Sequence, residues 1–524
     1  MKLKLFSASV FFCLFFFSLN AQMPGDRDLS FGNNGVQLIP FGGANAFGRS
    51  LAIQVDGKPV LACIVSNGFN PDFALVRLTT DGIPDTTFGT NGMVITDFAQ
   101  QNDFPGAIAI DGLDRIVVAG STESGNGDDF AVARYLPNGI LDSTFHHHGF
   151  LNQPVGTTSS CNAVAIQPDN KIVTGGYFFN PSSLMNEFAL MRFNEDGTLD
   201  ETFNEDGIVT TNMIIGNGIG KAMALQQDGK IILTGQAFND ATFLWEIGIA
   251  RYDTNGEPDS SFDEDGLAFL SVPGGNFTIT SMDLQDDKKI VVGGFFGTAP
   301  SNNRFAVARF HDDGKPDLDF GDNGVVLDSY GAEDNQITTL VTQPDGYILV
   351  AGTSLSGNAD RFAIARLTPD GDKDMTFGDE GVVIDVIGQN DGISSMALQQ
   401  DGKLVVAGES FNGTKFSIAF ARYETGILSA VNDPVFNEAS LSVYPNPAHE
   451  FIHVQYELKN TTTIQYILTD IAGKKLNLTS SSLTKNSGMN DELIQLPIDL
   501  MTGMYWLSLQ TPMSVETIKL MVTE

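Results

Sequence analysis

Cysteine is scarce in this chain, and a helical hydrophobic pattern is missing from it. Three of the 524 residues are cysteine, and one of them, Cys13, lies inside an apolar N-terminal stretch. The other two, Cys63 and Cys161, fall at different positions in different copies of a repeat described below, so we expect no disulfide between them. Stability must then come from packing. Because no segment shows sustained apolar spacing at the helical period, a mainly helical fold is excluded.

Basic residues are few as well. Lysine and arginine total 29 against 64 aspartates and glutamates, which gives a net charge of −35. A surface this acidic repels the phosphates of nucleic acids and anionic lipids, so we expect no nucleic acid as a partner. It is compatible with divalent cations, with basic partners, or simply with high solubility.

Long apolar runs are confined to the N-terminus. Residues 1–21 begin with Lys2 and Lys4, continue through a phenylalanine-rich stretch and end at Ala21, which is the pattern of a cleaved export signal. The apolar part is shorter than the ~20 residues that span a bilayer. We therefore predict an exported protein with no stable membrane span. Loss of the two lysines would change the net charge from −35 to −37.

A repeat of 57 to 59 residues fills most of the remaining chain. One block of it is an apolar run that ends in arginine, such as FAVARY at 130–135. A second block is a pair of apolar runs around a turn, such as SMALQQDGKLVVAG at 395–408. The third block, such as DTTFGTNG at 85–92, supplies a phenylalanine in every copy: Phe31, Phe88, Phe145, Phe203, Phe262, Phe320 and Phe377.

Each copy predicts four short β-strands. In residues 381–423 the runs are GVVIDVI, SSMALQ, KLVVAG and FSIAFARY, and QDG between the middle two is a tight-turn signal. Apolar residues at nearly consecutive positions indicate sheets buried on both faces, as in a propeller blade. We expect the long PDGxxDxTFGxxG segment to connect the last strand of one blade to the first strand of the next. The predicted fold is all-β: a seven-bladed β-propeller of four-stranded blades over residues 22–423.

The two ends of the repeated region carry spare, complementary residues. An open stack of the same units would need polar caps at its ends, but the first and last copies are as apolar as the others. Every repeated arginine has an aspartate eight residues later except Arg422, and Asp28 has no arginine before it. We predict that Arg422 pairs with Asp28 where the ends of a closed ring meet.

The seven arginine–aspartate pairs are expected to brace the fold. An arginine at the end of an apolar strand is buried, and its guanidinium then needs a carboxylate partner. Seven equivalent anion sites are the functional alternative, but identical residues in every copy favour a structural role. The glycines that close each turn are expected to have positive φ: Gly35, Gly92, Gly149, Gly207, Gly266, Gly324 and Gly381.

The three repeated blocks resemble the delta-60 repeat family. The resemblance rests on DGxLDxTFGxxG, AxARY and QxDGKIVVAG and covers about residues 26–423. It implies a secreted or surface-exposed bacterial protein with a β-propeller-like body. It implies no established activity, so no catalytic residue is carried over from it.

The repeat stops at Tyr423, and the composition changes after it. Residues 424–440 match no block and are predicted to be a linker. Residues 441–524 contain six strand-like runs, which predict a small C-terminal β-sandwich. An ordinary accessory β domain is the alternative to the more specific interpretation that follows.

The C-terminal segment also resembles the type A sorting domain of the type IX secretion system, which is found in Bacteroidetes. The matching stretches are YPNP at 444–447, DIAGKKL at 470–476 and LMTGMYWLSL at 500–509. The resemblance implies that the type IX secretion machinery is a partner and that the protein reaches the outer cell surface or the medium. It also implies removal of the tail by a cut in the linker, with release of the protein or its attachment to surface lipopolysaccharide.

Two kinds of turn invite a metal-binding interpretation. Adjacent histidines on one turn rarely converge on one ion, and no other ligand is placed beside His146, His147 and His148 by the sequence. NEDG at 204–207 and DEDG at 263–266 lack the alternating oxygen ligands of a calcium loop. Turn chemistry is favoured for both acidic segments, and calcium stays open as the alternative.

No residue is assigned a catalytic, cofactor-binding or metal-binding role. GNGIGK at 216–221 has the wrong spacing for a phosphate loop, and a strand rather than a helix follows it. We expect specificity to lie where the copies differ, as at Trp245 with Glu246 and at the insertion 177–187.

The first functional hypothesis is a non-catalytic binding or adhesion scaffold for a surface glycan or protein ligand. The alternatives are a secreted hydrolase or lyase acting on a polysaccharide or peptide, and a structural component of a surface layer. Several unlike acids or histidines around one central site would favour the enzyme. A centre lined only by repeat-equivalent residues would favour the scaffold.

Overall fold

The computed structural model describes residues 22–66, 70–98, 101–125, 127–213, 216–298, 302–329, 334–426, 441–458, 462–470, 475–478, 483–486, 488–497, 500, 502–510 and 515–523. The expected signal peptide and residues 427–440 of the expected linker lie outside these ranges. The chain divides into two compact units, one up to Gly426 and one with the C-terminal strands, and each is described by itself. No helix in the described residues is long and apolar enough to cross a membrane.

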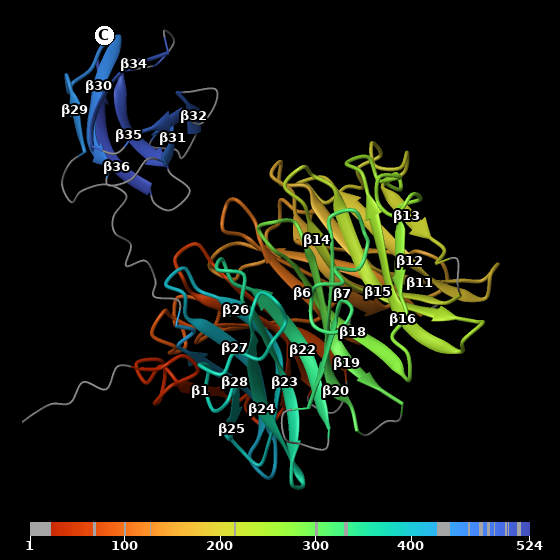
Figure 1. The fold of residues 1–524 in the computed structure, drawn as a ribbon. Helices are drawn as coiled ribbons and strands as arrows, with labels where there is room; N and C mark the ends of the chain where they lie inside the picture. Colours follow the sequence, from red (N-terminus) through yellow and green to blue (C-terminus); the bar gives the residue numbers. More distant parts are fainter. Residues whose placement is uncertain are drawn as a thin grey trace, which may run out of the picture. The chain divides into compact units, whose positions relative to one another are not determined.

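Within residues 22–426, the described residues form seven four-stranded antiparallel sheets, numbered 1 to 7 in the order of their first strands (Figure 1). Sheets 1 to 3 consist of β2 (Asn45–Ile53), β3 (Pro59–Ser66), β4 (Pro71–Arg77) and β5 (Met93–Thr96); β6 (Asp103–Ile110), β7 (Ile116–Glu123), β8 (Asp128–Tyr135) and β9 (Phe150–Gln153); and β10 (Ser159–Ile166), β11 (Ile172–Asn180), β12 (Met185–Phe193) and β13 (Ile208–Thr211).

Sheets 4 to 7 repeat this arrangement. They consist of β14 (Gly218–Leu225), β15 (Ile231–Asn239), β16 (Leu244–Tyr252) and β17 (Leu267–Leu270); β18 (Asn276–Leu284), β19 (Ile290–Gly297), β20 (Arg304–Phe310) and β21 (Val325–Asp328); β22 (Asn335–Thr342), β23 (Ile348–Ser356), β24 (Ala359–Leu367) and β25 (Val382–Asp385); and β26 (Asn390–Leu398), β27 (Leu404–Phe411), β28 (Phe416–Tyr423) and β1 (Val36–Ile39).

The sheets close into a ring. The first strand of each sheet contacts the first strands of both neighbouring sheets, and β26 of sheet 7 contacts β2 of sheet 1. The N-terminal strand β1 is the outer strand of sheet 7 and pairs with β28, with Val36 opposite Ala421 (Figure 1). A seven-bladed propeller with four-stranded blades is thus confirmed, and the open stack is excluded.

The expected place of the long connection was wrong. We expected PDGxxDxTFGxxG to link one blade to the next, but it joins the third and fourth strands of the same sheet. In sheet 6 it runs from β24 to β25, and Val382–Asp385 pairs with β24 rather than with the following blade. The short outer strand therefore belongs to the preceding blade, because the connection is long enough to fold back over that sheet's own edge.

The two ends of each sheet differ in the connections that they carry. One end, called the hairpin end, carries the tight turn between the first and second strands together with the long connection. The opposite end, called the loop end, carries the links between the second and third strands and between neighbouring sheets. The glycines that close the long connection have φ between 85° and 91°, as predicted.

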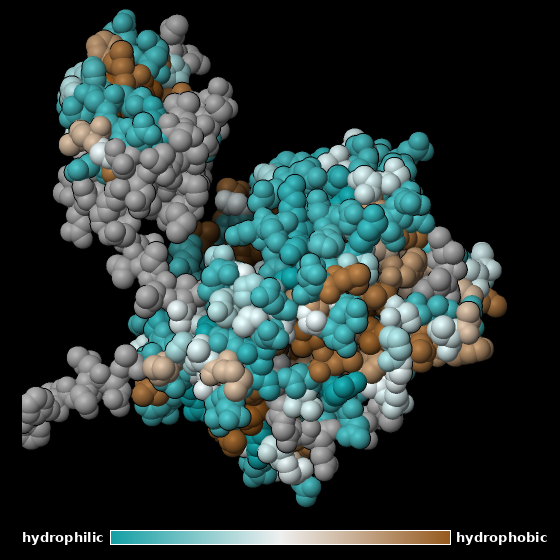
Figure 2. All heavy atoms as spheres, viewed as in Figure 1, coloured by the Kyte–Doolittle hydropathy of each residue, from teal (hydrophilic) through white to brown (hydrophobic). Residues whose placement is uncertain are grey.

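The middle strands supply the core. In β3 and β7 seven consecutive residues are buried, because a neighbouring sheet covers each face. Cys63 and Cys161 are free, buried thiols in sheets 1 and 3, so the expectation of no disulfide is confirmed. The visible surface of the ring is mainly hydrophilic, with hydrophobic residues in smaller areas (Figure 2).

Every first strand contains a bulge near the ring axis. The register against the second strand shifts by one residue in each sheet, which leaves one residue unpaired. Asn162 and Thr338 use this position to donate hydrogen bonds to carbonyls of the next sheet, at 2.8 and 2.6 Å. The seven bulged residues are Arg49, Gly106, Asn162, Lys221, Thr280, Thr338 and Ser394.

The C-terminal unit is a small β-sandwich, as predicted. One described sheet contains β29 (Ser442–Tyr444), β30 (Phe451–Leu458) and β34 (Gly488–Gln495), and the other contains β31 (Thr462–Asp470), β32 (Lys475–Asn477), β35 (Gly503–Gln510) and β36 (Val515–Val522), with β33 (Leu483–Lys485) beside β31. Side chains from both sheets share one core, including Val454 and Leu507. Asn446 of the YPNP motif accepts a hydrogen bond from the Met521 amide at 2.9 Å and so fixes the first strand to β36.

Candidate binding site

The arginine–aspartate pairs form in all seven sheets, including the one across the chain ends. Arg422 Nε donates to Asp28 at 2.7 Å, and the two residues are 6 % and 2 % exposed. The predicted closing pair is confirmed. The other six pairs have nitrogen–oxygen distances of 2.6 to 3.0 Å: Arg77–Asp85, Arg134–Asp142, Arg192–Asp200, Arg251–Asp259, Arg309–Asp317 and Arg366–Asp374.

Each arginine also ties its own sheet to the next one. Arg192 donates to the Thr254 carbonyl of sheet 4 at 2.6 Å, and Arg422 donates to the Thr80 carbonyl of sheet 1 at 2.7 Å. The guanidinium carbons lie 4.3 to 5.0 Å from the ring centroids of the repeated phenylalanines. Because these contacts engage the guanidinium on several sides, the pairs act as a brace and not as open anion sites.

The aspartates of the brace are held in their charged form. Burial by itself raises the pKa of Asp85, but hydrogen bonds from Thr87 and the charges of Arg77 and Lys58 outweigh it and lower the pKa to about 2. Since an unfolded aspartate has a pKa of about 3.9, this pair contributes stability that is present above pH 4 and lost as the pH falls towards 2.

A second repeated brace, which the sequence reasoning missed, lies at the loop end. An asparagine at the start of a first strand accepts a hydrogen bond from a backbone amide of the third strand in the preceding sheet, at 2.9 to 3.1 Å: Asn45, Asn217, Asn276 and Asn390. The signal was the return of asparagine at the spacing of the repeat. The polar residues that recur in these two braces therefore hold neighbouring sheets together.

Among the described residues, the three adjacent histidines and the two acidic turns are not grouped with other metal-ligating side chains. His146, His147 and His148 are exposed on one turn, and His146 and His147 have positive φ. Asp206 and Asp265 of the two acidic turns each accept a hydrogen bond from a backbone amide two residues later, at 2.9 Å. These acids act within their own turns, as the turn interpretation expects.

The remaining candidates also have local structural roles. GNGIGK leads directly into β14, and its Lys221 is a bulged residue of that strand. Glu246 is buried and accepts a hydrogen bond from Asn239 at 2.9 Å. Glu187, at the end of the 177–187 insertion, accepts the same kind of bond from Asn180 at 3.0 Å. These two glutamates stabilise the loops in which they lie.

Three carboxylates that sequence reasoning did not connect meet at the loop end of sheets 1 and 2. Ligand atoms of Asp72, Asp97 and Asp103 lie within 4.8 Å of one another, and they are the one such grouping in the described part of the chain. Burial raises the pKa of Asp103 to about 6, against hydrogen bonds from Thr122 and the Phe98 amide, and the charges of Asp97 and Asp72 add to the rise.

This cluster predicts a stability loss on going from acid to neutral pH. The folded pKa of Asp103, about 6, lies above the unfolded value of about 3.9, so the folded state holds a proton that the unfolded state has released. Stability from this group is complete below pH 4 and falls by about 3 kcal/mol in total by pH 7, with about half of the fall above pH 5. We expect Asp103→Asn to abolish the part of this fall, about 1.4 kcal/mol, that lies between pH 5 and pH 8 in urea unfolding. An unchanged difference between the two pH values would contradict the assignment.

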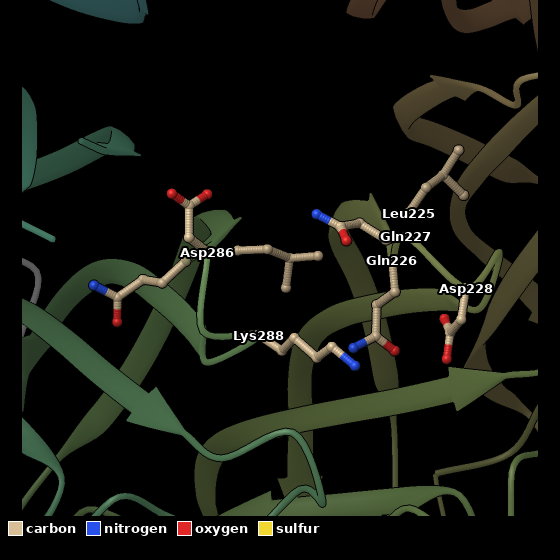
Figure 3. Close-up of a pocket in the computed structure, with 8 residues that line it drawn as sticks. Leu225, Gln226, Gln227, Asp228, Asp286 and Lys288 are labelled. Atoms are coloured by element: carbon tan, nitrogen blue, oxygen red, sulfur yellow. The ribbon is translucent and has the colours of Figure 1, made fainter. Parts of the chain in front are cut away.

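A small pocket of about 200 Å³ lies at the hairpin end between sheets 4 and 5 (Figure 3). In Figure 3 the Lys288 side chain extends towards the Gln226 amide. Three glutamines line the pocket, and two of them donate hydrogen bonds to the protein: Gln226 to Asp312 at 2.7 Å and Gln285 to the Gly346 carbonyl at 3.1 Å. The pocket therefore lies on the repeated turns between the first and second strands, and part of its polar lining already bonds to the protein.

A larger polar groove lies at the loop end between sheets 5 and 6. Two adjoining cavities of about 390 and 430 Å³ share Gly297, Thr298 and Asn303. The inner cavity reaches Gln336 of the first strand β22, and the outer one reaches Arg304 of β20. This groove, called the sheet 5–6 groove below, combines amide, hydroxyl and guanidinium groups.

One further polar group stands apart from the repeat. Burial raises the pKa of Glu409, in β27, to about 7, against the charge of Arg49 and a hydrogen bond from the Gly48 amide. One of its carboxylate oxygens is buried and has no hydrogen-bond partner in the described part of the chain. The equivalent residues in sheets 1 and 2 are Ile64 and Ser121, so those two sheets have no acid at this position.

Together, the ring, its closing strand and its tail define a β-propeller built for export. Each repeat matches the family model described as "Domain of unknown function (DUF5122) beta-propeller", at residues 56–88, 114–145, 167–203, 226–262, 285–320, 343–377 and 399–426. Residues 442–523 match the model described as "Secretion system C-terminal sorting domain". The chain is thus a DUF5122 β-propeller protein with a secretion sorting domain, which places it outside the cell or on the outer surface.

Solved structures with a similar fold are distant. The polysaccharide lyase Uly1 aligns over 78 % of this chain and 94 % of its own, with 12 % identity and a TM-score of 0.45. The β-propeller domain of the Trilobed protease from Pyrococcus furiosus aligns over 75 % and 98 %, with 13 % identity and a TM-score of 0.40. A search of curated proteins found no match to the sequence. At these identities and scores, none of the structures bears on what this chain binds.

Proposed function

We propose that the propeller is a non-catalytic scaffold that binds a glycan outside the cell. The proposal rests on a difference between two sets of polar groups in the propeller. Those repeated in every sheet are engaged in braces, whereas the sheet 5–6 groove offers unlike amide, hydroxyl and guanidinium groups at the loop end. Neutral donors and acceptors of this kind can exchange hydrogen bonds with sugar hydroxyls without performing chemistry on them.

The centre of the ring supports binding over catalysis. The seven bulged residues of the first strands are not all alike, but none of them is an acid or a histidine. General acid–base chemistry needs a pair of groups with separated pKa values near one reacting bond. Glu409 alone favours the second candidate, a secreted hydrolase or lyase, because its pKa of about 7 suits a general acid or base.

A glycan array combined with a turnover assay tests the proposal. The ring, residues 22–426, is purified after removal of the tail, and its fold is checked by cooperative unfolding. We expect retention of specific oligosaccharides with no change in their length. Cleavage of a bound glycan that Glu409→Gln abolishes would establish the enzyme instead. Neither binding nor turnover across glycans and peptides would overturn the proposal and favour a structural role.

A further inference from the structure

Arg304 is an exposed cation in a strongly acidic protein. It begins β20 at the loop end, and its guanidinium carbon lies 5.6 Å from the ring centroid of Phe296, which limits its movement. No carboxylate lies within ion-pair distance of it in the part of the chain that the structure describes. An arginine with no counter-ion among the described residues, in a protein with 64 acidic and 29 basic residues, points to a partner with a negative charge.

The same strand position in other sheets shows that this arrangement is not a feature of the repeat. The residues there are Asp72, Asp129, Glu187 and Glu246 in sheets 1 to 4, and Arg361 in sheet 6. Arg361 donates to the Gln389 carbonyl at 2.9 Å and lies 3.7 Å from Asp391. Arg361 is therefore satisfied within the fold, whereas Arg304 faces a cavity.

The groups that line the inner cavity, which adjoins the cavity of Arg304, suit a chain of hydroxyls. Thr278 and Gln336 are half-buried in the first strands of sheets 5 and 6, and their side chains make no hydrogen bond within the described ranges. The half-buried Phe295 ring lines the same cavity. Donors, acceptors and an aromatic face thus extend from the ring axis outward to the guanidinium.

We propose that the sheet 5–6 groove binds an acidic saccharide, with Arg304 holding a carboxylate or sulfate and Gln336 and Thr278 bonding to sugar hydroxyls. The inference rests on the proposed function and adds the class of ligand and the place where it binds. A guanidinium forms paired, charge-assisted hydrogen bonds with either anion. Elsewhere the acidic surface repels anions, so binding is confined to this groove.

The test compares matched acidic and neutral oligosaccharides on the full ring. Tetragalacturonate, a sulfated galactan tetramer and a neutral galactan tetramer are titrated into residues 22–426 by calorimetry at 150 mM salt. We expect the acidic ligands to bind and Arg304→Gln to weaken them at least ~10-fold, since a hydrogen bond to a charged group contributes that much. Lys415→Gln removes one positive charge from an exposed loop at the same end of sheet 7 and should leave affinity unchanged.

The outcomes separate this inference from the proposed function. Equal affinity of Arg304→Gln and the unaltered ring would overturn the groove as the acidic-sugar site while leaving glycan binding intact. Tighter binding of the neutral tetramer would do the same. Binding of an acidic peptide in the groove, with no response to any saccharide on the array, would overturn both. Gln336→Ala supplies a second variant, expected to weaken acidic and neutral sugars alike.

Discussion

Replacing Arg422 by alanine is expected to destabilise the ring by about 3 kcal/mol, because buried Asp28 would lose one of the two cations that compensate its charge. Asp28 would keep Lys403 at 2.8 Å and the Ser30 hydroxyl at 2.7 Å, which holds the loss at the low end of the range for breaking a buried ion pair. The contact to the Thr80 carbonyl of sheet 1 would also be lost. Urea unfolding of residues 22–426 at pH 7 measures the change.

Two further variants make this result specific. Arg192→Ala breaks an equivalent brace away from the chain ends. It should lower the free energy of unfolding by about as much as Arg422→Ala, because both arginines contact an aspartate and a carbonyl of the next sheet. Arg304→Ala shortens an exposed arginine and should change stability by less than about 0.5 kcal/mol. A loss for Arg422→Ala as small as that for Arg304→Ala would show that the closing pair does not hold the ring.

The sequence predicted the ring because its ends were complementary, but periodicity alone does not say where a blade begins. Arg422 and Asp28 were spare residues, and pairing them needed only the rule that a buried guanidinium needs a carboxylate. A search for spare strands at the chain ends, like the search for spare residues, would have shown that the short outer strand belongs to the preceding blade. VQLI at 36–39 follows the first turn motif without a preceding blade, as the outer strand of sheet 7 must.

The candidate sites could not be predicted from the sequence, because the residues of each site come from different strands and sheets. Asp72, Asp97 and Asp103 come from three strands or strand ends in two sheets, and only the ring's geometry brings them within 4.8 Å. Arg304 and Gln336 likewise lie in separate sheets. A partial signal existed, because Arg304 occupies a position where sheets 1 to 4 carry acids, and departures from a repeat are where specificity is expected.

Removing residues 22–40 is expected to have the largest effect on the propeller. The deletion takes away β1, the buried Asp28 and Phe31, which is 0 % exposed in the core shared by sheets 7 and 1. Loss of the phenylalanine side chain alone costs about 3–5 kcal/mol, and stranding Arg422 costs a similar amount. The truncated ring should therefore lose most or all of its cooperative folding at 25 °C.

The truncated chain is expected to self-associate as well as to lose stability. Without β1, the apolar strand β28 becomes an exposed edge, and such edges recruit other strands, so the truncated chain is expected to self-associate. A synthetic peptide of residues 22–40 added in excess should restore cooperative unfolding, and the same peptide with Phe31→Ala should restore it poorly. A truncated protein that stays monomeric and as stable as the full ring would show that the N-terminal strand does not close the propeller.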